Sequence, residues 1–193
     1  SRGDAKDYST FHVIDTNTDE VVAEYKGKIP PDRFGELLDW IGKKYYNALV
    51  CPENNTFGYA TVTKLKELGY PNLYYESSKG FLIGNYSPNQ DSKIPGFSTQ
   101  GKSRIQILSK LEEVIRNRGV RIYSSRLYDE LKTFIWKGHK AQAQKSANDD
   151  LVMALAIGIW LYDAGGTYSK GSDVLNKSML QAMSVTNRTY EQP

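Results

Sequence analysis

The segment SANDDLVMALAIGIWLYD, from Ser146 to Asp163, places two adjacent aspartates in front of a long apolar run. The apolar run, residues 151–162, predicts a helix that is buried in the protein core. It is shorter than the roughly 20 residues that a membrane span needs, so no membrane association is expected. Asp149 and Asp150 repel each other, yet carboxylates in a first helical turn gain about 0.3–1 kcal/mol each from the helix dipole. A shared divalent cation would also relieve the repulsion, and the segment alone leaves both interpretations open.

The rest of the chain alternates between short apolar segments and segments with helical spacing. A polar turn at residues 17–19, between β-branched and aromatic residues, predicts a β-hairpin over residues 8–29. Helices are expected over residues 33–45, 57–68, 102–117 and 126–136, and short strands over residues 48–51, 72–76 and 120–124. The polar connection over residues 137–148 is expected to form a hairpin in part.

This order of elements predicts an α/β fold in which a mixed β-sheet is flanked by helices on both faces. We expect one domain over residues 1–164, followed by a polar, weakly ordered tail over residues 165–193. Hydrophobic residues make up 39% and charged residues 24%, which excludes wholesale disorder. The single cysteine, Cys51, argues against a disulfide framework or a cysteine-rich metal cluster and fits a reducing, intracellular compartment.

The charge distribution permits a polyanionic partner, because the formal net charge is +3 and the isoelectric point is about 8.8. Between residues 102 and 126 only two glutamates oppose a group of basic residues: Lys102, Arg104, Lys110, Arg116, Arg118, Arg121 and Arg126. This region is a candidate phosphate-facing surface. The sequence has no Walker A loop and no GxGxxG motif, so nothing in it indicates nucleotide hydrolysis.

Acidic residues outside the aspartate pair provide two further candidate positions. Glu53 follows the first strand expected after the hairpin, at the edge of a sheet where ligands gather. It is either a solvated loop carboxylate or a metal ligand supported by Asn54 and Asn55. Asp4 and Asp7, before the hairpin, fit ordinary turn chemistry as well as a site.

The two histidines and the cysteine are not expected to carry chemistry. His12 alternates with core residues in the first strand of the hairpin, and His139 lies in a polar loop. Neither histidine has partners at metal-ligand spacing, and the chain has no HExxH motif, so both are expected to be structural or solvent-facing. Cys51 is expected to be a small core residue.

Carboxylates that converge on a mixed sheet with a basic face indicate a nuclease. Two Mg²⁺ or Mn²⁺ ions held by such carboxylates would activate a water molecule and stabilise the leaving oxygen of a phosphodiester.

Three segments carry a family resemblance, in this order: SRGDAKDYSTFHVID, ALVCPENNTFG and NDDLVMALAIGIW. They resemble the C-terminal nuclease domain of large terminase subunits from tailed phages, most closely the T4-like type, over residues 1–162. The resemblance implies an RNase H-like (resolvase/integrase-like) fold. It also implies metal-dependent endonuclease cleavage of concatemeric double-stranded DNA during genome packaging, in the cytoplasm of an infected bacterium.

The resemblance assigns roles to individual carboxylates. The family's central glutamate falls on Glu53 and its late aspartate on Asp150, so these two would be the catalytic ligands of Mg²⁺ or Mn²⁺, with two ions expected. Asp149 and Asp7 would be supporting carboxylates. The family's first-strand aspartate would lie upstream of the first residue, unless Asp4 or Asp7 replaces it. We favour the upstream position, because the family's first strand also precedes this chain.

Double-stranded DNA is the expected partner, contacted at its phosphates by Lys102, Arg104 and Lys110 without reading of the base sequence. The resemblance further implies three protein partners, which are the upstream terminase ATPase domain, the portal and the small terminase subunit. Two other functions are left open. One is another RNase H-like nuclease of the Holliday-junction resolvase type, and the other is a nucleic-acid-binding or protein-binding module with an incomplete metal site.

Overall fold

The computed structural model describes residues 8–77, 93–137, 140–144 and 147–162. Asp4, Asp7, His139 and the predicted tail lie outside these residues. The described part of the chain is a mixed α/β protein with five helices and three small, two-stranded antiparallel sheets. None of these described helices has the length and apolar character needed to cross a lipid bilayer.

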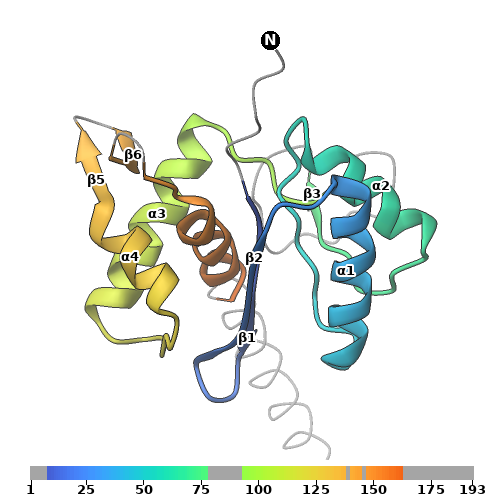
Figure 1. Ribbon diagram of the computed structural model, residues 1–193, viewed down its shortest axis with the longest axis horizontal. Helices are drawn as coiled ribbons and strands as arrows, with labels where there is room; N and C mark the ends of the chain where they lie inside the picture. The colour runs from blue at the N-terminus through green and yellow to red at the C-terminus, as the bar shows by residue number, and fades with distance from the viewer. Residues whose placement is uncertain (1–7, 78–92, 138–139, 145–146, 163–193) are drawn as a thin grey trace, which may run out of the picture.

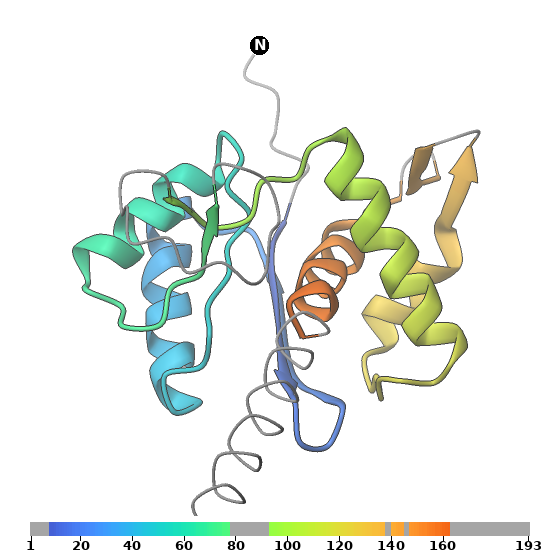
Figure 2. The ribbon, with the colours of Figure 1, turned by 180° about the vertical axis from the view of Figure 1, so that it is seen from behind.

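A β-hairpin runs through the middle of the molecule, between two groups of helices (Figures 1 and 2). Its strands are β1 (Ser9–Asp15) and β2 (Glu20–Gly27), which pair in antiparallel fashion with a shift in register between Val13 and Ile14. In the turn, the Asp15 carboxylate accepts a hydrogen bond from the Asn17 N–H at 2.8 Å, which is ordinary turn chemistry for an aspartate. The hairpin predicted from the sequence is confirmed.

Helices α1 (Pro31–Lys44) and α2 (Gly58–Glu67) cover one side of the hairpin (Figure 1). The rings of Phe11 and Tyr25 stack with their centroids 5.6 Å apart, and the Phe34 ring stacks on both, at 6.4 Å from Phe11 and 6.3 Å from Tyr25. This stacking joins both strands to α1. A small core gathers beside them: Leu38, Val50, Leu65 and Tyr70. The first two predicted helices are therefore confirmed.

A helix over residues 150–162, which we call the central helix, lies on the other side of the hairpin. Helices α3 (Gly101–Arg116) and α4 (Ser125–Thr133) lie on its far side (Figure 1). The main core includes fully buried residues at the four-residue spacing of a helix, together with residues from α3 and α4: Leu151, Leu155, Ile159, Ile107, Leu111 and Leu127. The predicted buried helix is confirmed, because its apolar residues are enclosed on several sides.

The small sheets do not join into one extended sheet among the described residues. Strand β3 (Tyr75–Ser77) pairs with β4 (Lys93–Pro95), and β5 (Phe134–Lys137) pairs with β6 (Lys140–Ala143), each in antiparallel fashion. In the part of the chain that the structure describes, parallel pairing is limited to isolated bridges: Glu20 with Arg121, Val50 with Leu73, Glu53 with Phe97, and Tyr75 with Gly96. The α/β class is as predicted, but the extended mixed sheet that the helices were expected to flank is not present in this part of the chain.

Two predicted strands are reduced to such bridges. The segment over residues 48–51 forms a bridge only at Val50, and its ladder is short because Pro52 has no N–H to donate. The segment over residues 120–124 forms a bridge only at Arg121, whose carbonyl oxygen accepts a hydrogen bond from the Val21 N–H at 2.9 Å.

The predicted helix over residues 126–136 is wrong at its end. Helix α4 stops at Thr133, and Phe134 takes an extended backbone with φ −87° and ψ 117°. Phe134, Ile135 and Trp136 are residue types that favour strands, which explains why β5 begins here. The pairing of β5 with β6 confirms that the polar connection forms a hairpin in part.

Candidate functional site

The aspartate pair stands at the start of the central helix. The Asp149 carbonyl oxygen accepts the first helical hydrogen bond, from the Met153 N–H at 2.9 Å. Its carboxylate accepts a hydrogen bond from the Arg104 guanidinium of α3 at 2.8 Å, and these two side chains are 31% and 26% exposed. An arginine therefore offsets the charge of Asp149, which relieves part of the repulsion between the paired aspartates.

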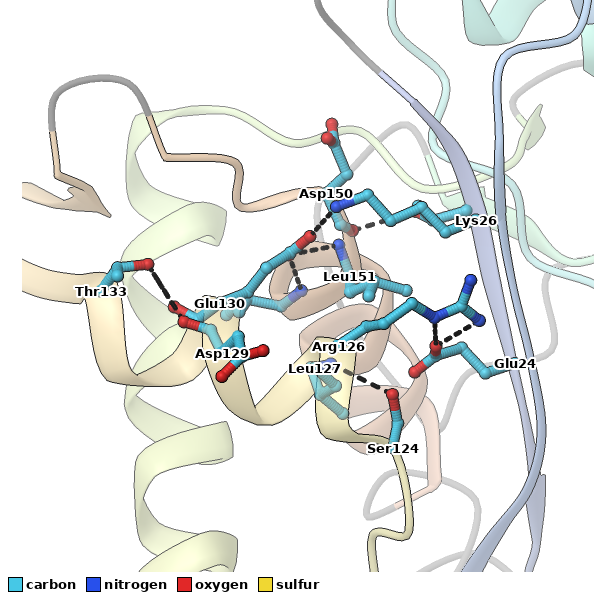
Figure 3. Close-up of polar contacts among 12 residues, drawn as sticks. Glu24, Lys26, Ser124, Arg126, Leu127, Asp129, Glu130, Thr133, Asp150 and Leu151 are labelled. Carbon is cyan, nitrogen blue, oxygen red and sulfur yellow. Dashed lines mark hydrogen bonds and ion pairs between the residues drawn. The ribbon is translucent and has the colours of Figure 1, made fainter.

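Asp150 is held through its backbone. Its carbonyl oxygen accepts a hydrogen bond from the Thr10 hydroxyl of β1 at 3.0 Å, which brings the start of β1 beside the start of the central helix. Figure 3 shows the Asp150 side chain pointing away from Glu130. Asp150, which the family resemblance implies is a metal ligand, therefore has a fixed backbone at the junction of a strand and a helix.

Glu53 is half-buried in a tight turn that precedes α2. Two backbone hydrogen bonds bracket it, from the Phe97 N–H to the Pro52 carbonyl at 2.9 Å and from the Asn54 N–H to the Phe97 carbonyl at 2.7 Å. The Asn55 side-chain amide donates to the Glu53 carboxylate at 3.2 Å. These contacts fix the direction of the Glu53 side chain.

The donor chemistry at these positions suits a hard divalent cation, because Glu53, Asp149 and Asp150 all offer carboxylate oxygens. Within the described residues, however, no group of three or more His, Cys, Asp or Glu side chains is placed to hold a metal. The structure therefore brings Asp149 together with Arg104, and it does not assemble Glu53 with the aspartate pair into a set of three. Asp7, predicted to assist, lies outside the described residues.

The predicted DNA-contacting residues on α3 differ in their surroundings. Lys102 is exposed, whereas Arg104 is engaged with Asp149. Lys110 is 19% exposed and forms an ion pair with Glu113 at 3.3 Å. Ion pairs at a protein surface contribute only about 0–1 kcal/mol, so a phosphate can compete for such cations.

His12 is structural. Its Nε2 donates to the Leu151 carbonyl at 3.0 Å, since a carbonyl oxygen can only accept, and its Nδ1 lies 3.9 Å from the Glu24 carboxylate. Burial lowers the pKa of the imidazole, because desolvation penalises the charged form. The hydrogen bond to Leu151 and the nearby carboxylates of Glu24 and Glu130 oppose that shift. Burial thus favours the neutral form of His12, which is enclosed beside the central helix.

Cys51 and Tyr74 lie beside the turn that carries Glu53. The partly buried side chain of Cys51 packs against the main core, and burial raises the pKa of its thiol well above the ordinary value. Burial also raises the pKa of the Tyr74 hydroxyl to about 12.

Glu130 is the residue that sequence reasoning missed. It belongs to α4, is only 6% exposed, and lies 2.5 Å from the Lys26 ammonium of β2 (Figure 3). Its other carboxylate oxygen accepts hydrogen bonds from the N–H groups of Leu151 at 2.8 Å and Val152 at 3.3 Å. The available signal was its place on the apolar face of α4, three residues after the buried Leu127.

No protein-family model matches this chain, and no curated protein matches it significantly. The family resemblance therefore rests on the three sequence segments quoted above.

Proposed function

We propose that this chain is the metal-dependent endonuclease domain of a viral DNA-packaging terminase, with an RNase H-like fold. The observation that supports this most is the contact between Thr10 and Asp150, because it sets the start of β1 beside the late aspartate. In the family resemblance, the remaining metal-binding aspartate lies upstream of Ser1, on a strand that would pair beside the start of β1. A carboxylate supplied there would meet Asp150 at the start of the central helix.

A strand upstream of the first residue, which the family resemblance implies, would enlarge the sheet that β1 and β2 form. Among the described strands, only β2 pairs with β1, so no described strand occupies the other edge of β1. A strand added there would begin to extend the hairpin into the mixed sheet that an RNase H-like fold requires.

In the proposed reaction, Glu53 and Asp150 bind the metal ions with their carboxylates. Bound Mg²⁺ or Mn²⁺ would supply an activated water and stabilise the leaving oxygen of the phosphodiester. Asn55 orients Glu53 through the 3.2 Å hydrogen bond, and Arg104 offsets the charge of Asp149 at the same helix start. Lys102 and its basic neighbours on α3 contact phosphates, so cleavage depends on backbone charge and not on base sequence.

The direct test is cleavage of plasmid DNA by the chain extended upstream of Ser1, with Mg²⁺ or Mn²⁺ supplied. We expect Glu53→Ala and Asp150→Ala to abolish cleavage, because each removes a metal-binding carboxylate. Glu67→Ala is the matched control, since that carboxylate is 59% exposed on α2 and its ion pair is with Lys64. Cleavage that survives either site substitution would overturn the assignment.

Two further measurements on the same extended chain distinguish the other two functions. A strong preference for branched DNA over linear duplex would indicate a Holliday-junction resolvase type of nuclease. Salt-dependent DNA binding without any heat of divalent-ion binding in calorimetry would indicate a DNA-binding module with an incomplete metal site.

A further inference from the structure

The carboxylate of Glu130 is buried between three elements. Lys26 of β2 balances its charge, and the first N–H groups of the central helix satisfy its second oxygen (Figure 3). The first four N–H groups of a helix have no partner within the helix, and the positive end of the helix dipole favours an anion there. Glu130 is thus a capping group supplied from a different helix.

The contacts of Glu130 belong to a larger set that fixes the peptide units around Asp150. The Thr10 hydroxyl donates to the Asp150 carbonyl at 3.0 Å, and the His12 imidazole donates to the Leu151 carbonyl at 3.0 Å. Glu130 accepts from the N–H of Leu151, the residue that directly follows Asp150. Side chains from β1 and α4 therefore hold both the carbonyl and the N–H of the peptide unit that joins Asp150 to Leu151.

We propose that Glu130 is a positioning residue for the carboxylate of Asp150. This inference rests on the proposed function, in which Asp150 binds metal. A metal ligand must be held within a fraction of an ångström of its productive place, and its supporting hydrogen bonds set that place. Glu130 does this through the backbone, because fixing the Leu151 N–H fixes the start of the helix from which the Asp150 side chain leaves.

A purely structural cap would stabilise the protein without affecting metal binding, so the test must separate the two. Ser124→Ala provides the matched control. The Ser124 hydroxyl caps the same helix α4 by accepting from the Leu127 N–H at 3.1 Å, and no contact joins it to the central helix start in Figure 3. Its loss weakens α4 and leaves the hydrogen bonds around Asp150 in place.

The experiment measures the Mn²⁺ concentration that gives half-maximal DNA cleavage, and Mn²⁺ affinity by calorimetry, in the chain extended upstream of Ser1. Glu130→Gln turns an amide NH₂ toward either Lys26 or the helix N–H groups. We expect about a 10- to 100-fold rise in the Mn²⁺ requirement, with KM for DNA unchanged, because the buried side chain does not reach DNA. Ser124→Ala should lower the thermal midpoint and leave the Mn²⁺ requirement as it was.

A second variant covers the case in which Glu130→Gln does not fold. Thr10→Val keeps a β-branched residue in β1 and removes only the hydrogen bond to the Asp150 carbonyl. It should raise the Mn²⁺ requirement in the same direction, by a smaller factor.

The outcomes are distinct. An unsubstituted chain that neither binds Mn²⁺ nor cleaves DNA overturns the proposed function and this inference together. An active unsubstituted chain whose Mn²⁺ requirement is unchanged by Glu130→Gln, or by Thr10→Val where Glu130→Gln does not fold, overturns the positioning role alone. A thermal loss as large as that of Ser124→Ala, with no change in metal affinity, would reduce Glu130 to a structural cap.

Discussion

Asp149 and Asp150 are neighbours in sequence with different surroundings in the structure. The carboxylate of Asp149 is paired with Arg104, and its carbonyl begins the central helix, so it has a structural part in the fold. Asp150 is fixed by its backbone, with Thr10 on its carbonyl oxygen. The helix-dipole interpretation and the metal-site interpretation of the doubled aspartate are thus not exclusive. One aspartate can stabilise the start of the helix while its neighbour binds metal.

The buried imidazole of His12 predicts a specific pH dependence of stability. Burial lowers its pKa in the folded state, so folding favours the neutral form. Its contribution is fully present above the unfolded pKa of about 6.5 and is lost as the pH falls through the lower folded pKa. The free energy of unfolding should therefore decrease below about pH 6.5, with a slope from this group of up to about 1.4 kcal/mol per pH unit.

Urea unfolding of the original chain and of His12→Gln over this pH range checks the prediction. Glutamine can still donate to the Leu151 carbonyl but does not titrate, so the stability of the variant should fall less steeply with acid. His139 is the other histidine and is present in both proteins, so its contribution cancels. Parallel pH profiles for the two proteins would contradict the assignment.

Among the helices, the starts of α2 and α3 offer a matched pair of glycines. A Cβ on Gly58, the first residue of α2, would overlap the Glu53 carbonyl oxygen, whereas a Cβ on Gly101, the first residue of α3, would meet nothing within 4 Å. We expect Gly58→Ala to lower the free energy of unfolding by about 1–3 kcal/mol, since the turn that holds Glu53 must shift. Gly101→Ala should be neutral or slightly stabilising. Chemical denaturation of both variants measures the difference, and equal effects would show that the turn is not tightly packed.

The sequence predicted the elements whose signals are local. The hairpin around residues 17–19 and the amphipathic helices follow from turn residues and apolar spacing within a short window. The bridges at Val50 and Arg121 depend on partners far along the chain, so an apolar run alone could not show how far a ladder extends. Glu130 was missed because a charged residue on an apolar helix face becomes meaningful only when Lys26 and the start of the central helix are placed around it.

For the molecule as a whole, the interface between the hairpin and the central helix changes character along its length. At the start of the helix the contacts are hydrogen bonds from Thr10 and His12 to the helix backbone. Further along, Gly158 brings the helix close to Ile14, where a Cβ would lie 2.8 Å from the Ile14 Cδ1 atom. Directional hydrogen bonds thus fix the end that carries Asp149 and Asp150, apolar burial supplies cohesion further along, and the Tyr162 hydroxyl donates to the Asp19 carboxylate where the helix meets the hairpin turn.

The edge of β1 that faces away from β2 gives the last prediction, which tests the proposed fold independently of activity. Only β2 pairs with β1 among the described strands, so alternate N–H groups of β1 face away from β2. If the upstream residues form the family's first strand, adding them should slow amide hydrogen exchange at those N–H groups and raise the thermal midpoint, because an unpaired strand edge gains partners. Residue-resolved hydrogen exchange compares the 193-residue chain with the chain extended upstream of Ser1. A glycine–serine extension of equal length controls for the effect of added residues. Unchanged protection at these N–H groups would show that the upstream segment does not pair with β1. The proposed RNase H-like fold would then lack the strand that extends the hairpin into a mixed sheet.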